Sequence, residues 1–322
     1  MYRGRVRARA RAAGLAIGVL ADLVFGDPRR GHPVAGLGTV ATALERRVYR
    51  DSRIAGAGYT AVLTGATVTA GVLVERVLRR GGPGYGAAAT AAATWAVLGG
   101  TSLIREGSAL AGALDAGDTT AARARIPSLC SRDPLSLDAG GMARAGVESL
   151  AENTSDAVVG PLVWGAVAGI PGLLGYRAVN TLDAMVGYRS ERYLRFGWAS
   201  ARLDDLANLV PSRITALLTV ALAPLVGGDP RAAVRAWRRD AAGHPSPNAG
   251  PVEATAAGAL GLRLGGATSY AHGTEHRPVL GDGAAPSVAD LHRAARLSRA
   301  VAAAAGVLAV AVAAARTGDV VG

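Results

Sequence analysis

Long apolar stretches alternate with polar ones along most of the chain, at lengths that suit a membrane. Residues 54–74 and residues 84–104 contain no charged side chain. A helix rises about 1.5 Å per residue, so each stretch is long enough to cross a hydrocarbon core of about 30 Å. The short polar link between them contains Gly and Pro, which favour a turn. These two stretches predict a transmembrane helical hairpin.

Three further apolar stretches are shorter or interrupted. Residues 157–176 are long enough to span but contain Pro161 and Pro171, which favour a kinked or re-entrant passage over a straight crossing. Residues 214–228, whose helix could start as early as Leu206, and residues 300–315 are short apolar helices. The pattern predicts an all-α polytopic membrane protein with about four to six membrane segments. Residues 1–322 form a single domain in this prediction, and polar helices and loops carry the site.

The N-terminus combines alternating arginines with an apolar run. The arginines are Arg3, Arg5, Arg7, Arg9 and Arg11. Asp22 interrupts the apolar run and no A-x-A cleavage site follows, so a signal peptide is disfavoured. We expect an uncleaved membrane or interfacial helix with its arginine end in the cytoplasm.

The charge balance is basic, with a formal net charge of +11, and every basic residue is Arg. An Ala- and Gly-rich chain without lysine reflects a GC-rich genome as much as a function, and no nucleic-acid-binding motif occurs. We therefore expect no nucleic-acid partner, since basic cytoplasmic loops are typical of membrane proteins. Cys130 is the single cysteine, which excludes an internal disulfide and a cysteine metal cluster.

An acidic stripe precedes the apolar stretch at 157–176. Glu148, Glu152 and Asp156 are spaced four residues apart, so a helix would place them on one face. Like charges at this spacing repel, and a divalent cation or arginines from elsewhere would offset the repulsion. Mg²⁺ prefers a few carboxylates with water and phosphate oxygens. The stripe predicts part of a magnesium site, and a solvated helix face is the alternative.

A dense group of charges, amides and aromatic rings occupies residues 180–213. Asn180 and Asp183 lie one helical turn apart, and Asp204, Asp205 and Asn208 form a second acidic-amide group. Between the two groups stand Arg189, Arg192, Arg195 and Arg202, with Tyr188, Tyr193, Phe196 and Trp198. Arginine binds carboxylate and phosphate through paired donors, and acidic-amide groups beside it suit Mg²⁺ with a phosphoryl group. The alternative is an amphipathic interfacial helix with internal ion pairs.

Two proline-braced turns carry similar side chains. The first contains Asp27, Arg29 and His32. The second contains His244, Ser246, Asn248 and Glu253. A helix is expected to start after Pro251, with free N–H groups that could receive an anion. A lone histidine is more often structural than catalytic, and the sequence contains no HExxH, P-loop or dinucleotide-binding glycine motif, so any ATP site lacks a familiar loop.

Four separate blocks carry a family resemblance. They are DLVFGDPRRGHPV, SRDPLSLDAGGMARAGVESLAENTSDAVVGPL, YRAVNTLDAMVGYRSERYLRFGWASARLDDLANLVPSR, and HPSPNAGPVEATAAGALGLRLGG followed by RPVLG. In this order and spacing they resemble the CobD/CbiB family of cobalamin biosynthesis, the membrane-bound adenosylcobinamide-phosphate synthases. The resemblance extends from Leu15 to the C-terminal helix. Gly31 departs from the family, which often has a hydrophobic or aromatic residue before the His-Pro pair.

The resemblance implies a reaction. The carboxylate of adenosylcobyric acid is joined by an amide bond to (R)-1-amino-2-propanol O-phosphate, or to aminopropanol itself, giving adenosylcobinamide phosphate or adenosylcobinamide. The enzyme class is an acid–amine ligase, with ATP as co-substrate and Mg²⁺ as cofactor. A carboxylate condenses with an amine only after activation, most simply as an acyl phosphate, which requires a phosphoryl donor, a metal and cations.

Roles within these blocks are hypotheses. The candidate catalytic residues are Glu152, Asp183, His32 and His244, with a histidine or carboxylate as general base for the incoming ammonium. The candidate Mg²⁺ ligands are Glu148, Glu152, Asp156, Asp183, Asp204 and Asp205. The candidate substrate- and phosphate-binding residues are Arg189, Arg192, Arg195, Arg202, Asn153, Asn180, Asn248, Asp27 and Arg29.

The expected partners are the corrinoid, the amino alcohol or its phosphate, the lipid bilayer and other enzymes of the corrinoid pathway. The expected location is the cell membrane, with the site loops in the cytoplasm. If residues 157–176 enter and leave by one face, the polar regions 105–156 and 177–213 share a side, which we favour; a straight crossing would separate them. Two rival functions are a transporter, indicated by Asp22 in an apolar stretch, and a non-catalytic membrane partner of soluble enzymes. Long polar regions and the lack of inverted repeats argue against transport.

Overall fold

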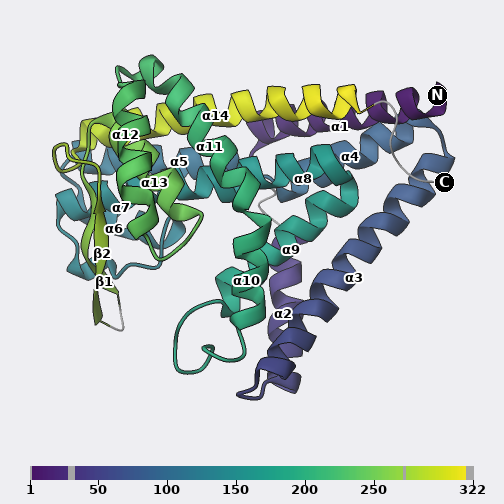
Figure 1. The fold of residues 1–322 in the computed structure, drawn as a ribbon, viewed down its shortest axis with the longest axis horizontal. Coiled ribbons are helices and arrows are strands. Elements are labelled where there is room, and N and C mark those ends of the chain that lie inside the picture. The colour runs from purple at the N-terminus through teal and green to yellow at the C-terminus, as the bar shows by residue number, and fades with distance from the viewer. Residues whose placement is uncertain (1, 28–32, 271–272, 317–322) are drawn as a thin grey trace. The chain divides into compact units, whose positions relative to one another are not determined.

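The computed structural model describes residues 2–27, 33–270 and 273–316, which form helices and one two-stranded ribbon (Figure 1). The chain divides into two compact units that alternate along the sequence. Unit 1 comprises Met1–Gly99, Gly160–Asn208 and Ala305–Gly322, and unit 2 comprises Gly100–Val159 and Leu209–Ala304. Each unit is thus assembled from segments that lie far apart in the sequence.

Four helical segments are long and apolar enough to cross a membrane. They are Arg53–Arg80, Pro83–Asp115, Leu209–Val226 and Val288–Ala315. These segments contain or overlap the apolar stretches at 54–74, 84–104, 214–228 and 300–315, and their number falls within the predicted range. The prediction of an all-α polytopic membrane protein is confirmed.

The regular secondary structure in the described part of unit 1 is all helical. Its elements are α1 (Tyr2–Phe25), α2 (Pro33–Val48), α3 (Arg53–Arg80), α4 (Pro83–Val97), α8 (Gly160–Ala168), α9 (Ile170–Val186), α10 (Trp198–Ala207) and the end of α14 (Val288–Ala315). Helix α1 packs closely along α4 because its glycines face threonines. A Cβ on Gly14 would stand 2.5 Å from Cβ of Thr90, and one on Gly18 would stand 2.4 Å from Cβ of Thr94. This packing places the arginine-rich start of α1 beside the turn between α3 and α4.

The apolar stretch at 157–176 is interrupted. Helix α8 has nine residues and rises about 14 Å, which is short of a hydrocarbon core of about 30 Å. Gly169, with φ of 70°, turns the chain into α9, and Pro171 occupies the first turn of α9, where its missing N–H is harmless. A Cβ on Gly172 would lie 2.2 Å from the Trp164 carbonyl oxygen, so glycine permits α9 to fold back on α8. The interruption that the prolines predict is present, and the membrane face that each end reaches stays a prediction.

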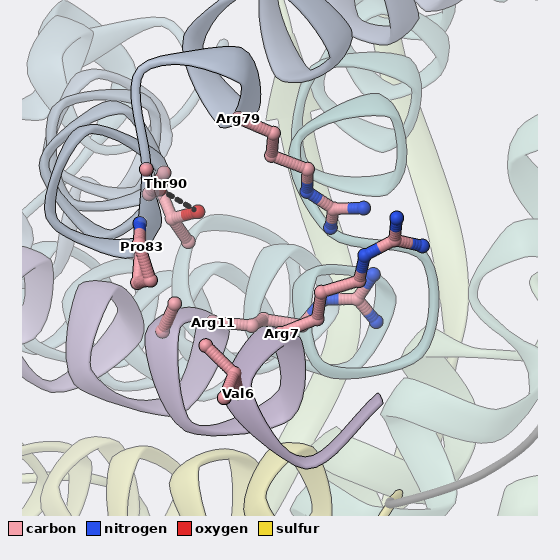
Figure 2. A pocket seen from close by; sticks show the side chains of 9 residues that line it. Val6, Arg7, Arg11, Arg79, Pro83 and Thr90 are labelled. Atoms are coloured by element: carbon pink, nitrogen blue, oxygen red, sulfur yellow. Dashed lines mark hydrogen bonds between the residues drawn. The ribbon is translucent and has the colours of Figure 1, made fainter. Parts of the chain in front are cut away.

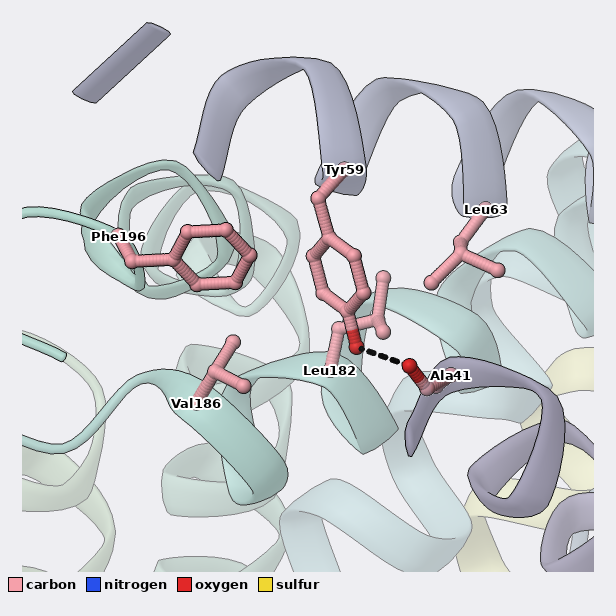
Figure 3. Packing of buried hydrophobic residues seen from close by; sticks show 6 residues of the cluster. All are labelled: Ala41, Tyr59, Leu63, Leu182, Val186 and Phe196. Carbon is pink, nitrogen blue, oxygen red and sulfur yellow. Dashed lines mark hydrogen bonds between the residues drawn. The ribbon is translucent and has the colours of Figure 1, made fainter. Parts of the chain in front are cut away.

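A buried apolar cluster holds the arginine-rich segment 188–197 within unit 1 (Figure 3). Its members are Ala41, Tyr59, Leu63, Leu182, Val186 and Phe196. The rings of Tyr59 and Phe196 lie 5.1 Å apart, and the Tyr59 hydroxyl donates to the Ala41 carbonyl at 3.2 Å. A Cβ on Gly56 would stand 1.7 Å from the Phe196 carbonyl oxygen, so only glycine admits this approach. The cluster joins α2, α3 and α9.

Unit 2 combines helices with the ribbon. Its elements are α5 (Gly100–Asp115), α6 (Thr119–Arg125), α7 (Ala139–Thr154), a π-helical turn (Ser155–Val159), α11 (Leu209–Leu222), α12 (Pro230–Asp240), α13 (Ala249–Leu260), β1 (Leu264–Tyr270), β2 (Gly273–Leu280), the start of α14, and 3₁₀ turns at Ile126–Ser128, Pro134–Ser136, Ala223–Val226 and Ala241–Gly243. Strands β1 and β2 pair antiparallel, with a register shift between Leu264 and Gly266. The sequence pattern did not predict this ribbon, because its strands are short and their apolar positions do not alternate.

Helix α13 forms the centre of unit 2, since all of its residues are buried. It begins at Ala249, so the start predicted after Pro251 is wrong. The Ser246 hydroxyl oxygen accepts from the N–H groups of Asn248 at 3.3 Å and Ala249 at 3.1 Å. A serine cap therefore occupies part of the helix start that the sequence left open for an anion.

Candidate functional site

Three glutamates, two arginines and a histidine gather in the interior of unit 2. They are Glu148, Glu152, Glu253, Arg132, Arg277 and His244. Helices α7 and α13 supply the glutamates, β2 and the loop before α7 supply the arginines, and the turn before α13 supplies the histidine. We refer to these six residues as the glutamate cluster.

The register shift in the ribbon connects the cluster to α7. Glu148 accepts from the Gly265 N–H at 2.7 Å, and Arg144, one turn earlier, donates to the Gly265 carbonyl at 2.8 Å. Gly265 has φ of 76°, and a Cβ there would lie 2.0 Å from the Pro278 carbonyl oxygen, so the position requires glycine. Pairing of Gly266 with Arg277 then brings Arg277 to the cluster.

Glu148 is fully partnered. Besides the Gly265 N–H, it binds Arg132 in an ion pair whose two side chains are both buried. A buried carboxylate is stable in such a setting because a cation and a backbone donor replace its water. The predicted role of Glu148 as a metal ligand therefore competes with two existing contacts.

Glu253 differs, because its carboxylate is 1% exposed and lacks a hydrogen-bond donor among the described residues. The nearest cationic groups are Arg277 NH1 at 3.8 Å and His244 Nε2 at 3.9 Å from its Oε1. Burial raises the pKa of Glu253 well above its usual range, and the charges of Glu152 and Glu148 add to the shift. Buried polar groups in native proteins are nearly always hydrogen-bonded, so an unsatisfied carboxylate marks a site for a proton, a cation or a ligand donor.

Two neighbours of Glu253 also titrate abnormally. Burial raises the pKa of Glu152, and the charge of Glu148 contributes in the same direction, while Arg277 opposes it. Burial lowers the pKa of His244, so the imidazole is neutral near pH 7. His244 Nδ1 lies 3.3 Å from the carbonyl and 3.1 Å from the N–H of Ser246. When Nδ1 accepts from the Ser246 N–H, the proton of the neutral ring is on Nε2, on the side of Glu253. In the other tautomer Nδ1–H donates to the Ser246 carbonyl, and the lone pair of Nε2 faces Glu253.

Whether Mg²⁺ fits this cluster depends on the carboxylate oxygens of Glu152 and Glu253, which would be its ligands. No three His, Cys, Asp or Glu side chains converge on a metal position within the described ranges. Mg²⁺ commonly uses one or two carboxylates and takes its other ligands from water and phosphate. Glu253 has two oxygens without donors, and its charge interacts with that of Glu152, so the pair fits this mode.

The acidic stripe on α7 is shorter than its spacing predicts. Helix α7 ends at Thr154 and a π-helical turn follows, which contains Asp156. A π turn has more residues per turn than an α-helix, so the four-residue spacing that defines the stripe does not hold beyond Thr154. The role of Asp156 as a metal ligand stays a prediction, and Glu253 is the third glutamate of the cluster. π turns of this kind are frequent at functional sites.

The two predicted amides of unit 2 make structural contacts. Asn153 donates to the Ser149 carbonyl at 3.0 Å and to the Ser149 hydroxyl at 2.9 Å. The side-chain oxygen of Asn248 accepts from Arg213 at 2.8 Å and from the Ser212 hydroxyl at 3.1 Å. Their role in orienting substrate stays a prediction.

In unit 1 the structure brings two predicted residues together, Asn180 and Asp204. Asn180 donates to Asp204 at 3.5 Å, and Asn208 donates to the other Asp204 oxygen at 2.9 Å. The Tyr176 hydroxyl completes the chain by donating to Asn208 at 2.7 Å. This network connects α9 with α10, so it has a structural function whatever else it does.

Two further predicted acids of segment 180–208, Asp205 and Asp183, lie near an arginine and a tyrosine respectively. Asp205 pairs with Arg202 at 3.5 Å; burial raises the pKa of Asp205, and the charges of Arg202 and Arg189 oppose that shift. Burial raises the pKa of Tyr188, and the charge of Asp183 adds to it. The roles of Asp183 and Asp205 as metal ligands stay predictions.

Arg192 and Arg195, like Arg202, are predicted to bind phosphate and pair with carboxylates in this structure. Arg192 binds Glu45 of α2 at 2.9 Å and lies over the Tyr49 ring, 4.0 Å from its centroid. Arg195 lies 3.7 Å from Asp51, and both side chains are 59% exposed. Both carboxylates lie outside residues 180–213, so these ion pairs are not internal to the segment, and phosphate binding by the two arginines stays a prediction.

Of the three residues predicted in the first proline-braced turn, the structure describes only Asp27. Asp27 directly follows α1, and the predicted residues Arg29 and His32 lie outside the described part of the chain. Their proposed roles stay predictions.

Neither Arg132 nor Arg277 is among the residues predicted from the sequence, and Glu253 is named there beside His244 without an assigned role. Arg132 precedes α7, Glu253 is the single acid of an otherwise uncharged helix, and Arg277 lies in β2. The sequence does indicate that Glu253 is unusual, because it is a single acid within an apolar run. Arg132 and Arg277 carry no comparable local signal, because neither belongs to a charge pattern.

The sequence is similar to those of known proteins over most of its length. The family described as CobD/CbiB protein matches residues 15–298. A cobalamin biosynthesis protein CobD from Mycobacterium tuberculosis is 59% identical over 302 residues, covering 94% of this chain and 96% of the relative. Proteins of the same name from Geobacter metallireducens and Rhodobacter capsulatus are 44% and 41% identical, covering 82% and 89% of this chain and 84% and 93% of the relatives. No solved structure matches the chain. The chain belongs to the CobD/CbiB family of cobalamin biosynthesis.

Proposed function

We propose that this protein is an ATP-dependent ligase that joins the carboxylate of adenosylcobyric acid to 1-amino-2-propanol or its O-phosphate. Membership of a cobalamin-biosynthesis family supports the pathway. The observation that carries the chemistry is Glu253, a buried carboxylate with no hydrogen-bond donor in the described structure, set beside arginines and a neutral histidine.

The reaction has two steps in this proposal. A carboxylate oxygen of the corrinoid attacks the γ-phosphorus of ATP, which forms an acyl phosphate and releases ADP. The amine nitrogen then attacks the acyl carbon, forms the amide bond and expels inorganic phosphate. The incoming ammonium loses one proton to become a nucleophile and a second as the amide forms, and one of the two leaves on the released phosphate at neutral pH.

The cluster supplies the groups for both steps. Arg277 and Arg132 provide positive charge for transferred phosphate, although Arg132 is already paired with Glu148. Glu253 and Glu152 attract the ammonium of the amine, because burial leaves their negative charge poorly compensated. His244 accepts a proton from the amine through Nε2, and its neutral form at pH 7 suits a general base.

Mg²⁺ fits the same carboxylates. Glu152 and Glu253 would hold it together with phosphate oxygens of ATP, and the ion would neutralise phosphate charge there. The ammonium and Mg²⁺ need not occupy the cluster at the same moment, since phosphoryl transfer precedes amide formation.

Isotope transfer tests the reaction directly. Detergent-purified protein is mixed with adenosylcobyric acid labelled with ¹⁸O in its reacting carboxylate, with aminopropanol phosphate and with MgATP. We expect adenosylcobinamide phosphate by mass spectrometry, with ¹⁸O in the released inorganic phosphate, because the acyl phosphate loses a carboxylate oxygen to phosphorus.

Omission of each component provides the controls. Product that forms without ATP, or phosphate that stays free of ¹⁸O while product accumulates, would refute activation as an acyl phosphate. A complete absence of product with either amine, in protein whose unfolding transition is cooperative, would refute the ligase assignment. Uptake of labelled corrinoid into liposomes would then favour the transporter.

A further inference from the structure

Unit 1 contains a cavity of about 310 Å³ where the start of α1 meets the turn between α3 and α4 (Figure 2). It is lined by Val6, Arg7, Ala10, Arg11, Arg79, Gly82, Pro83, Gly86 and Thr90. Arginines from two helices thus converge on a cavity whose other walls are apolar or glycine. The proposed ligase reaction uses none of these residues.

The three arginines carry more positive charge than the local acid neutralises. Arg79 pairs with Glu75 one turn earlier on α3, and Arg11 lies 3.7 Å from the same carboxylate. Arg7 is exposed, and it has no ion pair or hydrogen bond with any residue that the structure describes. Figure 2 shows the guanidinium groups of Arg7, Arg11 and Arg79 directed toward one region.

Arg11 also fixes the geometry of the cavity. Its NH1 donates to the carbonyls of Ala166 at 3.3 Å and Val167 at 3.1 Å, at the end of α8. These contacts satisfy carbonyls that a helix end leaves without intrahelical partners. Arg11 therefore has a structural role, while Arg7 keeps its donors available.

The start of α4 adds to the positive potential. Gly82 precedes this 15-residue helix without a side-chain cap, and Pro83 is its first residue. The backbone N–H groups of Gly84 and Tyr85 have no intrahelical acceptor at this position, and the helix dipole is positive there. Gly82 and Gly86, both in the cavity wall, leave the backbone open to a ligand.

The position along α3 sets the level of the cavity in the bilayer. Helix α3 has 28 residues and is about 42 Å long, which exceeds a hydrocarbon core of about 30 Å. Its last residues, including Arg79, therefore reach the headgroup region. Val6, Ala10 and Pro83 provide apolar wall beside the charged groups.

We propose that this cavity binds a phosphate group, carried by an acidic phospholipid or by a soluble phosphate ester. Paired guanidinium donors and free backbone N–H groups match the oxygens of a phosphate. The headgroup level and the apolar wall favour the lipid, because a phospholipid presents its phosphate there with its acyl chains directed toward the hydrocarbon core.

The test compares two double variants with the same loss of charge. Arg7→Gln with Arg79→Gln removes two arginines of the cavity. Arg9→Gln with Arg80→Gln removes two exposed arginines of the same helices that do not line it. Binding of dioleoylphosphatidylglycerol to the detergent-purified protein is titrated by native mass spectrometry, with dioleoylphosphatidylcholine for comparison. Glycerol 3-phosphate and inorganic phosphate are titrated separately by the shift of the unfolding midpoint.

For the wild type and the control variant we expect one phosphatidylglycerol bound in preference to phosphatidylcholine, and for the cavity variant at least about tenfold weaker binding. The same dependence on Arg7 and Arg79 for glycerol 3-phosphate, with no preference for phosphatidylglycerol, would assign the cavity to a soluble ester. Equal affinity of the two double variants for every probe, or no saturable binding, would overturn the proposal. Ligase activity of the wild type does not enter either result.

Discussion

The glutamate cluster of unit 2 and the segment 180–208 of unit 1 are both rich in charged side chains, but they differ in how far those side chains are buried and paired. In the segment, arginines pair with carboxylates at or near the surface, as Arg195 does with Asp51. In the cluster, Glu253 is buried with no hydrogen-bond donor among the described residues. The segment has the higher density of charges in the sequence, yet it is the cluster that contains a buried carboxylate without a hydrogen-bond donor.

The difference shows what marks a candidate site. An exposed ion pair is screened by solvent and costs little to form or to lose. A buried carboxylate beside two others raises the free energy of its own ionised form, and that energy is recovered when a cation or substrate binds. Functional importance should therefore follow burial and lack of partners more closely than the number of charges.

The largest effect expected from this comparison is that of Glu253→Gln on turnover. The substitution keeps the size of the side chain and removes its charge, so it should fold, and the rate of adenosylcobinamide phosphate formation should fall by about 10²-fold or more. Product formation is measured by mass spectrometry at saturating substrates. Glu106→Gln, which alters a carboxylate paired with Arg125 elsewhere in unit 2, is the matched control and should retain activity. Full activity of Glu253→Gln would remove the basis of the proposed site.

Arg132→Met should have the largest effect on stability. It leaves Glu148 buried without its cation, which typically destabilises a protein by about 3–5 kcal/mol. The unfolding midpoint in detergent is the measurement. Adding Glu148→Gln removes the uncompensated charge and keeps an acceptor for the Gly265 N–H, so the double variant should recover part of the loss. A double variant no more stable than Arg132→Met would show that the ion pair is not the cause.

Much of the fold could be predicted from sequence because membrane segments are local. An uncharged run such as residues 54–74 is enough to predict a membrane helix there, and the prolines within residues 157–176 are enough to predict that this second stretch is interrupted. The ribbon is different, because its bend depends on Gly265 and on the approach of Pro278 from the other strand. No local pattern contains that contact.

The site could be predicted only in part for the same reason. Glu148 and Glu152 lie together on one helix, as their spacing predicts, and His244, also selected from the sequence, lies in the same cluster. Their association with Glu253 depends on how α7 packs against α13. The contact of Glu148 with Gly265 joins residues 117 positions apart. Asp156 lies in a π turn, which periodicity does not reveal, so the predicted α-helical stripe ends before it.

Stability should also depend on pH through Glu253, with a smaller effect than Arg132→Met. The folded state raises the pKa of Glu253 above its ordinary value of 4.5, so the folded state binds the proton more tightly than the unfolded state. Its stabilising contribution is present below that value and is lost as the pH rises toward the folded-state pKa. The unfolding midpoint of the wild type, without added Mg²⁺, should therefore fall relative to that of Glu253→Gln as the pH rises above 4.5. Parallel curves for the two proteins would show that Glu253 ionises normally.

The smallest effect is expected for Arg195→Gln, and it decides how far the comparison extends. Arg195 and Asp51 are both 59% exposed and 3.7 Å apart, so the pair should contribute at most about 1 kcal/mol. The unfolding midpoint should change little, and that small change should vanish at high salt because exposed charges are screened. Turnover should stay within about twofold of the wild type, since the arginine is already used in a surface pair. A loss of turnover comparable to that of Glu253→Gln, with an unchanged unfolding midpoint, would mean that Arg195 leaves Asp51 to hold substrate. The charged segment of unit 1 would then belong to the site, and the density of charge in the sequence would have been the better guide.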